Sequence, residues 1–369
     1  MIDYIKIEGY KSIKNLELEL RPINVLIGSN GSGKSNFLSF FKLLRAIFNR
    51  QLQHFVMQEK ADNILYFGRK TTEHLDGKVM FSQNDSTNNA YIFRLAQTQD
   101  GDLFINYEGS GYNVRKEDDI QNYKYENSLK ESSIPLSTHS NDKDLNEFLS
   151  DIQAYHFHDS SNTSWLREGS DIEDNKALKS DGRNLAAFLY KLKNNNPIIY
   201  NRILKTVQSV APYIYDFILE PSETKGREND IELRWIDRND LNTNFSAHHF
   251  SDGTIRFIAL ATVLLQPTPP AVIIIDEPEL GLHPLAISKL YGMIQATSKK
   301  TQIIISTQSV TLVNFFSADE IITVDRDEVE KQSTFRRLKS EDFNIWLNEH
   351  SLGELWERNI INSAQPFTK

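Results

Sequence analysis

A glycine-rich segment near the N-terminus has the residue types and spacing of a phosphate-binding loop. Gly28-Ser29-Asn30-Gly31-Ser32-Gly33-Lys34-Ser35 matches the pattern G-x-x-x-x-G-K-[ST] in full. Its small residues let backbone N–H groups close around phosphate oxygens. Lys34 would place a fixed positive charge on the β- and γ-phosphates, and the Ser35 hydroxyl would bind Mg²⁺. A plain glycine-rich turn is the alternative. The residues expected to contact nucleotide are Asn30, Gly31, Ser32, Gly33, Lys34, Ser35 and Asn36.

The flanking sequence supplies the strand and the helix that such a loop requires. The apolar run 23–27 ends at Gly28, and Phe37, Phe41 and Leu44 then recur at helical spacing. A helix that begins near Lys34 would turn the positive end of its dipole toward the phosphates. The order strand, loop, helix therefore favours phosphate binding over a plain turn.

Two carboxylates follow a second apolar run. Residues 271–275 are typical of a central parallel strand buried on both faces, and Asp276 and Glu277 come directly after them. Open α/β sheets place their ligands at the carboxyl ends of such strands. We expect Asp276 to hold Mg²⁺, directly or through water, and Glu277 to orient and polarise the attacking water. A solvated Asp-Glu-Pro turn is the alternative.

Composition limits the classes of protein that remain. The 369 residues are 39% hydrophobic and 25% charged, as in an ordinary globular protein. With no cysteine, disulfides and cysteine-ligated zinc are excluded. The N-terminus lacks the apolar stretch of a secretory signal, and apolar runs such as 257–265 are too short for a bilayer, so we expect a cytoplasmic protein without a membrane partner. A net charge of −9 argues against coating nucleic acid, although a local basic groove leaves DNA contact open.

The motifs and their order resemble the ABC-type ATPases of the SMC, RecF and OLD kind, with most similarity to the short bacterial proteins predicted to be AAA-type ATP-binding proteins. The middle of the chain, 51–180, matches that group poorly. The matching segments are residues 5–13, the phosphate loop, Phe250-Ser251-Asp252-Gly253-Thr254, residues 275–284 and Ile305-Ser306-Thr307-Gln308-Ser309.

The resemblance implies an α/β fold: a P-loop NTPase head of the ABC/SMC type with an antiparallel β lobe, a helical lobe and no coiled-coil arm. It would be one ATPase domain over 1–369. Its parts would be an N-terminal strand, loop and helix (1–50), a β lobe with a polar insertion (51–180), a helical lobe (181–250), and the signature, acidic pair and C-terminal α/β half (251–369).

The resemblance also implies an ATPase whose two copies dimerise head to tail around Mg-ATP. Ser251 and Gly253 would form the signature that reaches the γ-phosphate held by the partner copy. From the residues themselves, Ser251 can cap the helix that follows, so that the Gly253 N–H and the helix dipole face an anion. A simple helix cap is the alternative.

Two positions depart from the group's pattern. Asp252 replaces a usual glycine and would weaken the clamp on the γ-phosphate unless its carboxylate points away. Gln308 replaces the usual histidine; it can donate a hydrogen bond to the γ-phosphate but carries no proton charge, so we expect it to act in catalysis at slow turnover. Lys11 is a further expected phosphate contact.

Several roles for the protein remain open at this stage. The resemblance suggests an ATPase that senses or gates for a separately encoded effector in bacterial anti-phage defence. The alternatives are a DNA-repair ATPase that acts on DNA directly and, with less support, the ATPase subunit of a transporter. An oligomer larger than a dimer is a further alternative.

Other polar residues are better explained by structure. His156 and His158 alternate on a predicted strand, but a metal site needs more ligands than these. His248 and His249 fit a solvated loop, and the resemblance places His283 at the dimer seam with no defined role. Asp325-Arg326-Asp327 fits a turn at a strand end better than a metal-dependent nuclease site.

Overall fold

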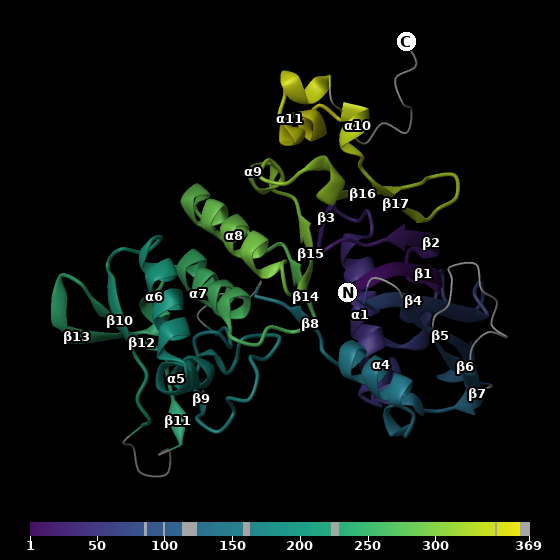
Figure 1. Ribbon diagram of the computed structural model, residues 1–369, viewed down its shortest axis with the longest axis horizontal. Helices are drawn as coiled ribbons and strands as arrows, with labels where there is room; N and C mark the ends of the chain where they lie inside the picture. The colour runs from purple at the N-terminus through teal and green to yellow at the C-terminus, as the bar shows by residue number, and fades with distance from the viewer. Residues whose placement is uncertain are drawn as a thin grey trace. The chain divides into compact units, whose positions relative to one another are not determined.

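The computed structural model describes residues 1–84, 87–98, 100–112, 124–157, 163–222, 229–343 and 345–361. Their contacts divide the chain into two units, both drawn in Figure 1. The first unit comprises Met1–Ile152, Gln302–Gln308 and Phe316–Lys369, and the second comprises Gln153–Thr301 and Ser309–Phe315.

Alternating apolar residues build an antiparallel sheet in the first unit. Ile5 and Ile7, two residues apart as one strand face requires, are fully buried. This six-stranded sheet has the order β2-β1-β4-β5-β6-β7, so it includes the two N-terminal strands of the chain. The strands are β1 (Ile2–Tyr10), β2 (Ile13–Glu19), β4 (His74–Asn84), β5 (Thr87–Gln97), β6 (Leu103–Tyr112) and β7 (Lys124–Leu129).

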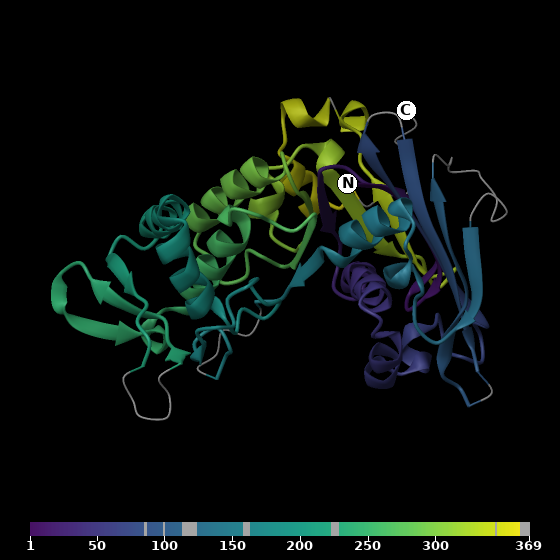
Figure 2. The same ribbon diagram turned by 60° about the horizontal axis from the view of Figure 1, so that its bottom comes forward.

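Helices cover one face of this sheet through aromatic contacts. The rings of Phe40 and Phe93 stack with their centroids 6.1 Å apart, and those of Phe48 and Tyr91 meet edge to face at 4.7 Å. Figure 2 shows α1 and α4 on the same side of the sheet. The helices are α1 (Lys34–Phe48), α2 (Leu52–Glu59), α3 (Ala61–Ile64) and α4 (Ser140–Ser150).

A second set of strands in the first unit carries the phosphate loop. Strand β3 (Ile23–Ile27) lies between β15 (Gln302–Thr307) and β16 (Ile321–Arg326), parallel to both, and β17 (Ser333–Arg337) pairs antiparallel with β16. Every residue of β3 and β15 is buried, as the apolar runs predict for parallel strands covered on both faces. Beyond β17 follow α10 (Ser340–Phe343) and α11 (Leu352–Glu357).

The second unit is built around one buried helix. All residues of α7 (Asp252–Leu265) from Ile255 onward are buried, which is the property of a helix surrounded by other elements. It packs against α6 (Pro197–Gln208) and α8 (Pro284–Thr297), as Figure 1 shows. The other elements are β8 (Ile152–Tyr155), β9 (Ser170–Asp171), α5 (Leu185–Asn195), β10 (Ile214–Ile218), β11 (Asp230–Ile231), β12 (Arg234–Asp237), β13 (Asp240–Ser246), β14 (Val272–Asp276) and α9 (Val310–Val313).

The stretch 181–250, expected from the resemblance to be a helical lobe, contains strands as well as helices. It begins with the helices α5 and α6, and a sheet of order β10-β12-β13 follows them. Most of β13 is exposed, so it lacks the apolar alternation by which a strand is recognised.

The helices of the described ranges are short. The longest, α1, has 15 residues, which agrees with a head that has no coiled-coil arm. Within the same ranges, no helix combines the length and the apolarity that crossing a bilayer requires.

Candidate functional site

The phosphate loop joins the end of β3 to the start of α1, and its glycines are sterically required. Gly31 (φ 78°) and Gly33 (φ 117°) adopt left-handed conformations that favour glycine. A Cβ atom on Gly33 would collide with the Ser333 side chain, and one on Gly28 would collide with the Val324 carbonyl. The path of the loop therefore requires glycine at positions 28 and 33, whereas at position 31 glycine is favoured by the backbone conformation alone.

Lys34 lies across the loop. Its Nζ donates to the carbonyl oxygens of Gly28 at 2.7 Å and Ser29 at 2.9 Å, and the side chain is largely buried. The Ser32 hydroxyl is also buried and has no hydrogen-bond partner in the described part of the chain. An ammonium group and a hydroxyl held inside one loop fit the recognition of an anion.

Two serines outside the phosphate loop, Ser12 and Ser333, support it through hydrogen bonds. Ser333 Oγ, at the start of β17, donates to the Ser32 carbonyl at 2.5 Å and lies 2.7 Å from Ser12 Oγ, within hydrogen-bond distance. Asn36 Nδ2 donates to Ser12 Oγ at 2.8 Å. Ser333 is 301 positions from Ser32 and belongs to no motif, so no pattern in the sequence could have identified it.

Strand register brings Gln308 to the edge from which the phosphate loop leaves the sheet. Thr307, the last residue of β15, aligns with Ile27, the last residue of β3. The next residues are Gln308 and Gly28, and both belong to the first unit. The predicted position of Gln308 beside the loop follows from this parallel pairing.

Lys11 and Asn36 line a common cavity of about 960 Å³ in the first unit. Lys11 has φ 47° and forms an ion pair with Glu59, Nζ to Oε2 3.3 Å, so its charge is already engaged. The exposed aromatic ring of Phe67 and the cation of Lys70 also line this cavity. Lys11 therefore lines a cavity together with Asn36, the residue that follows the phosphate loop.

The acidic pair occupies the predicted strand end in the second unit. Residues 272–275 of β14 are buried, whereas Asp276 and Glu277 are half-buried. Glu277 adopts φ 43°, a left-handed conformation that costs a residue other than glycine about 1–2 kcal/mol. Such strain is concentrated at functional sites, which favours a chemical role over a plain turn.

The signature-like segment caps α7 in the predicted manner. Ser251 Oγ accepts a hydrogen bond from the Thr254 N–H at 3.1 Å. A Cβ atom on Gly253 would collide with the Gly281 carbonyl oxygen, so the start of α7 lies directly against the turn that follows Glu277. Arg256 stabilises the contact between α7 and this turn by donating a hydrogen bond to the Leu280 carbonyl.

Arg167 forms an ion pair with Asp252, the residue whose negative charge was expected to weaken the clamp on the γ-phosphate. Its Nη2 lies 2.7 Å from Asp252 Oδ1, and its Nη1 donates to the carbonyl oxygens of Ala247 at 2.7 Å and Phe250 at 2.9 Å. The Arg167 side chain is only 2% exposed. The negative charge of Asp252 is therefore paired with Arg167 within the second unit. This pairing compensates for the replacement of the usual glycine by aspartate.

Burial also acts on the second arginine of this region. Desolvation lowers the pKa of Arg256, and the nearby carboxylates of Asp252 and Glu279 partly oppose the shift. A guanidinium remains protonated throughout the working range of proteins. Arg256 therefore keeps its charge while it bridges Leu280 and the Phe157 carbonyl, to which Nε donates at 2.7 Å.

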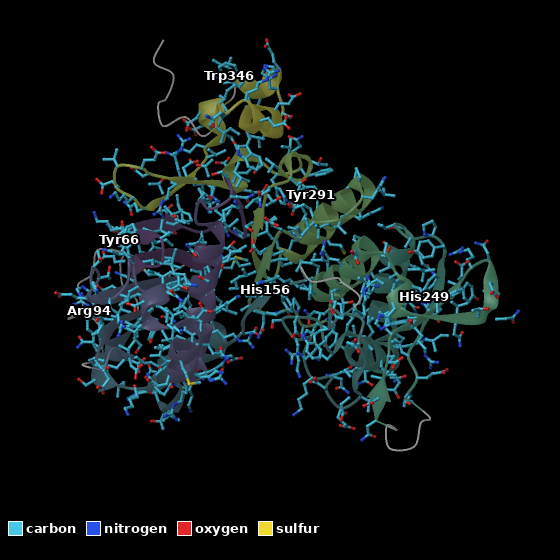
Figure 3. All side chains as sticks on the ribbon, turned by 180° about the vertical axis from the view of Figure 1, so that it is seen from behind. Tyr66, Arg94, His156, His249, Tyr291 and Trp346 are labelled. Atoms are coloured by element: carbon cyan, nitrogen blue, oxygen red, sulfur yellow. The ribbon has the colours of Figure 1, made fainter. Side chains whose placement is uncertain are left out.

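The histidines do not gather into a metal site in the described ranges. Figure 3 labels His156 and His249, which lie in separate parts of the second unit. His249 Nδ1 is 3.2 Å from Ser246 Oγ, and His283 Nδ1 accepts from the Leu285 N–H as the cap of α8. His158 lies outside the described residues. No group of three or more His, Cys, Asp or Glu in those ranges could hold a metal ion.

Asp325 and Arg326 are the last residues of β16, and Asp327 begins the connection that leads from this strand to β17. Asp327 Oδ1 accepts from the N–H groups of Val329 and Glu330, both at 2.9 Å. Burial raises the pKa of the Asp325 carboxyl, against a smaller opposing effect of Arg336.

The predicted residues thus form two sets, one in each unit. In the first unit, Lys11, Asn36 and Gln308 join the phosphate loop. In the second, Ser251 and Gly253 lie next to the turn that carries the acidic pair.

A substitution at Gly253 tests the contact between α7 and this turn. Gly253→Ala would drive a methyl group into the Gly281 carbonyl, so we expect the start of α7 to shift and the free energy of unfolding to fall by about 1–3 kcal/mol. Urea unfolding followed by circular dichroism measures the change.

Gly292→Ala is the matched control, because nothing lies within 4 Å of a Cβ atom placed there on α8. That variant should gain up to about 1 kcal/mol from helix propensity. Equal effects of the two substitutions would contradict a close α7 contact.

A known protein family matches most of this chain. The family model described as "AAA domain, putative AbiEii toxin, Type IV TA system" matches residues 23–314. This stretch contains the phosphate loop, the signature-like segment, the acidic pair and Gln308.

Curated relatives match over shorter stretches. The energy-coupling factor transporter ATP-binding protein EcfA of Methanosphaera stadtmanae is 31% identical over 160 residues, which are 42% of this chain and 56% of that protein. The protein of the same name from Methanocaldococcus jannaschii is 34% identical over 99 residues, 27% of this chain and 34% of its own length. The chain therefore spans about a third to just over half of these relatives.

Solved structures match over nearly the whole chain. An SMC head bound to the C-winged helix domain of ScpA has a TM-score of 0.60 at 17% identity and covers 92% of this chain and 98% of its own. The SMC head domain from Thermotoga maritima has a TM-score of 0.51 at 12% identity and covers 92% and 99%. At sequence identities this low, the match shows that the chains share a fold.

Proposed function

Since this chain belongs to the AAA-domain family with the AbiEii description, we propose that two copies of it close head to tail around Mg-ATP and gate a separately encoded effector. The chain is a P-loop ATPase of the ABC/SMC type, and its family is one of nucleotide-binding ATP hydrolases. The observation that most supports nucleotide binding here is Lys34, whose ammonium group binds the carbonyl oxygens of a loop that requires glycine at positions 28 and 33.

The residues offer the oxygen ligands that Mg²⁺ prefers. Ser35 provides a hydroxyl and Asp276 a carboxylate, and Mg²⁺ bound together with a nucleotide usually takes one or two such protein ligands, with phosphates and water completing its shell. The lack of an all-protein metal cluster among the described residues is compatible with this arrangement. When bound, Mg²⁺ would neutralise charge on the phosphates.

The chain's own groups then have distinct tasks. Lys34 and the backbone N–H groups of residues 30–35 bind and orient the phosphates. Glu277 accepts a hydrogen bond from the attacking water and aims it at the γ-phosphate. Gln308 donates a hydrogen bond without carrying a proton charge, so we propose slow turnover. A single-turnover rate equal to that of fast ABC ATPases would contradict this last point.

The dimer would complete each nucleotide site. Ser251 and the N-terminus of α7 present a hydroxyl, backbone N–H groups and a positive dipole end, which together suit the γ-phosphate held by the partner copy. The pairing of Asp252 with Arg167 supports this role, since it neutralises the one negative charge at that helix start. ATP would therefore hold the two copies together, and residues 1–369 would act as one ATPase head.

The role of a gate in anti-phage defence rests on the toxin description of the family. The fold shared with SMC heads supports the alternative of a DNA-repair ATPase. Stimulation of ATP turnover by free DNA ends alone would favour repair, whereas stimulation only by a co-encoded protein would favour the gate. The transporter role has less support, because relatives of that name match less than half of this chain.

Lys34→Ala tests nucleotide binding at the loop. Removing the ammonium group should weaken Mg-ATP binding by at least about 100-fold and abolish ATP-dependent dimerisation, because the lysine supplies the only side-chain cation of the motif. Fluorescence titration with a labelled ATP analogue and light scattering measure the two effects. Lys14→Ala, at an exposed lysine of β2, is the control and should change neither. Wild-type dimerisation of the Lys34 variant would refute the proposal.

A further inference from the structure

A groove in the second unit is lined by basic side chains. It has a volume of about 580 Å³ and lies between α6 and α8, the helices that flank α7 in Figure 1. Its lining residues are Ile198, Asn201, Arg202, Lys205 and Thr206 of α6, Ser209 directly after this helix, and Lys289 of α8. None of them belongs to the nucleotide motifs.

Within the part of the chain that the structure describes, the three cations of this groove have no acidic partner. Arg202, Lys205 and Lys289 are exposed, and none forms an ion pair with a carboxylate of the described ranges. The segments 197–209 and 284–301 contain five lysines and arginines, including Lys299 and Lys300, but no aspartate or glutamate. The chain as a whole has 50 acidic and 41 basic residues, so these helices depart from its composition.

An apolar side chain completes the groove. Ile198 is 82% exposed, which is unusual for isoleucine, and it precedes Arg202 and Lys205 on one face of α6. The positions i, i+4 and i+7 follow one helix face over ~10 Å. The groove thus presents one apolar contact followed by two positive charges in a row, with Lys289 facing them from α8.

We propose that this groove binds an acidic segment of a partner protein, a segment that also carries an apolar side chain to cover Ile198. Carboxylates on the partner would supply the counter-charges that the helices lack. A helix with a leucine followed by glutamates four and seven positions later matches the row on α6. Recognition of this kind is independent of ATP binding.

The same features argue against nucleic acid as the occupant. A sugar-phosphate backbone offers phosphates for the cations but no apolar group for Ile198. The net charge of −9 would also repel a duplex wherever it extends beyond the groove. A short protein segment meets both the charge and the apolar contact.

Fluorescence anisotropy with defined probes tests the proposal. The first probe is a labelled alanine-rich helical peptide with leucine and two glutamates at the stated spacing; the second replaces its glutamates by glutamine, and the third is a labelled duplex DNA. We expect the acidic peptide to bind the full chain, the glutamine peptide to bind at least about tenfold more weakly, and the DNA to bind more weakly than the acidic peptide.

Substitutions in the groove test whether the acidic peptide binds there. Arg202→Glu combined with Lys205→Glu should weaken the acidic peptide by at least about tenfold, and Ile198→Ser should weaken it by several-fold. Lys14→Glu, an exposed lysine of the first unit, is the matched control and should have little effect. Unchanged Mg-ATP affinity in the groove variants separates this proposal from that of the ATPase site. Failure of the acidic peptide to bind, equal binding of the glutamine peptide, or tighter binding of the DNA would overturn it.

Discussion

Replacing Glu277 by glutamine should lower ATP turnover by about 100- to 1,000-fold and leave Mg-ATP affinity nearly unchanged. The amide keeps the size of the side chain but cannot accept the proton of the attacking water. It also keeps the left-handed backbone of residue 277, so the fold of the turn should persist. Phosphate release under multiple turnover, together with a nucleotide titration, measures the two quantities.

The same variant should accumulate the dimer. If ATP joins two copies and hydrolysis separates them, Glu277→Gln with ATP should elute as a dimer on size exclusion, and adding Lys34→Ala should return it to a monomer. Glu220→Gln, at a glutamate that is 74% exposed in the second unit, is the control and should behave like wild type. Turnover in the Glu277 variant close to that of this control would exclude Glu277 as the residue that activates water.

Arg167→Ala should have a second large effect, on stability and on dimerisation. The substitution removes the side-chain donor to the carbonyl oxygens of Ala247 and Phe250, of which the first still accepts from the Phe250 N–H, and removes the cation beside Asp252. Loss of one member of a buried charged network costs about 3 kcal/mol, which urea unfolding can measure. Because the signature-like segment loses its support, ATP-dependent dimerisation should fall more than ATP affinity.

Two controls separate this role from a general loss of charge. Arg183→Ala removes an exposed arginine that pairs with Asp181, and such surface pairs contribute less than about 1 kcal/mol. Asp252→Asn should likewise have a small effect on stability, since that carboxylate is 64% exposed. An Arg167 variant that is destabilised yet dimerises with ATP as well as wild type would show that the arginine is structural only.

The sequence was most informative where a local pattern carries the physical constraint. The apolar run before Gly28 forms β3 because a parallel strand buried on both faces needs consecutive apolar residues. The buried β14 before Asp276 follows the same rule. The cap of α7 by Ser251 was also predictable, because capping involves residues only a few positions apart.

Contacts between distant residues could not be predicted. Arg167 meets Asp252 across 85 positions, and Ser333 meets the phosphate loop across 301. Neither residue belongs to a pattern, because a single arginine or serine has the same appearance at any position of a sequence. The strand β13 was missed for a different reason, since its exposed residues show no apolar alternation.

Isothermal titration calorimetry of Mg-ATP with the purified chain tests nucleotide binding most directly. The phosphate loop and the acidic pair predict saturable binding at one site per chain, which should weaken strongly when EDTA removes Mg²⁺. A titration without magnesium-dependent heat, repeated with protein whose circular dichroism shows that it is folded, would contradict the central claim.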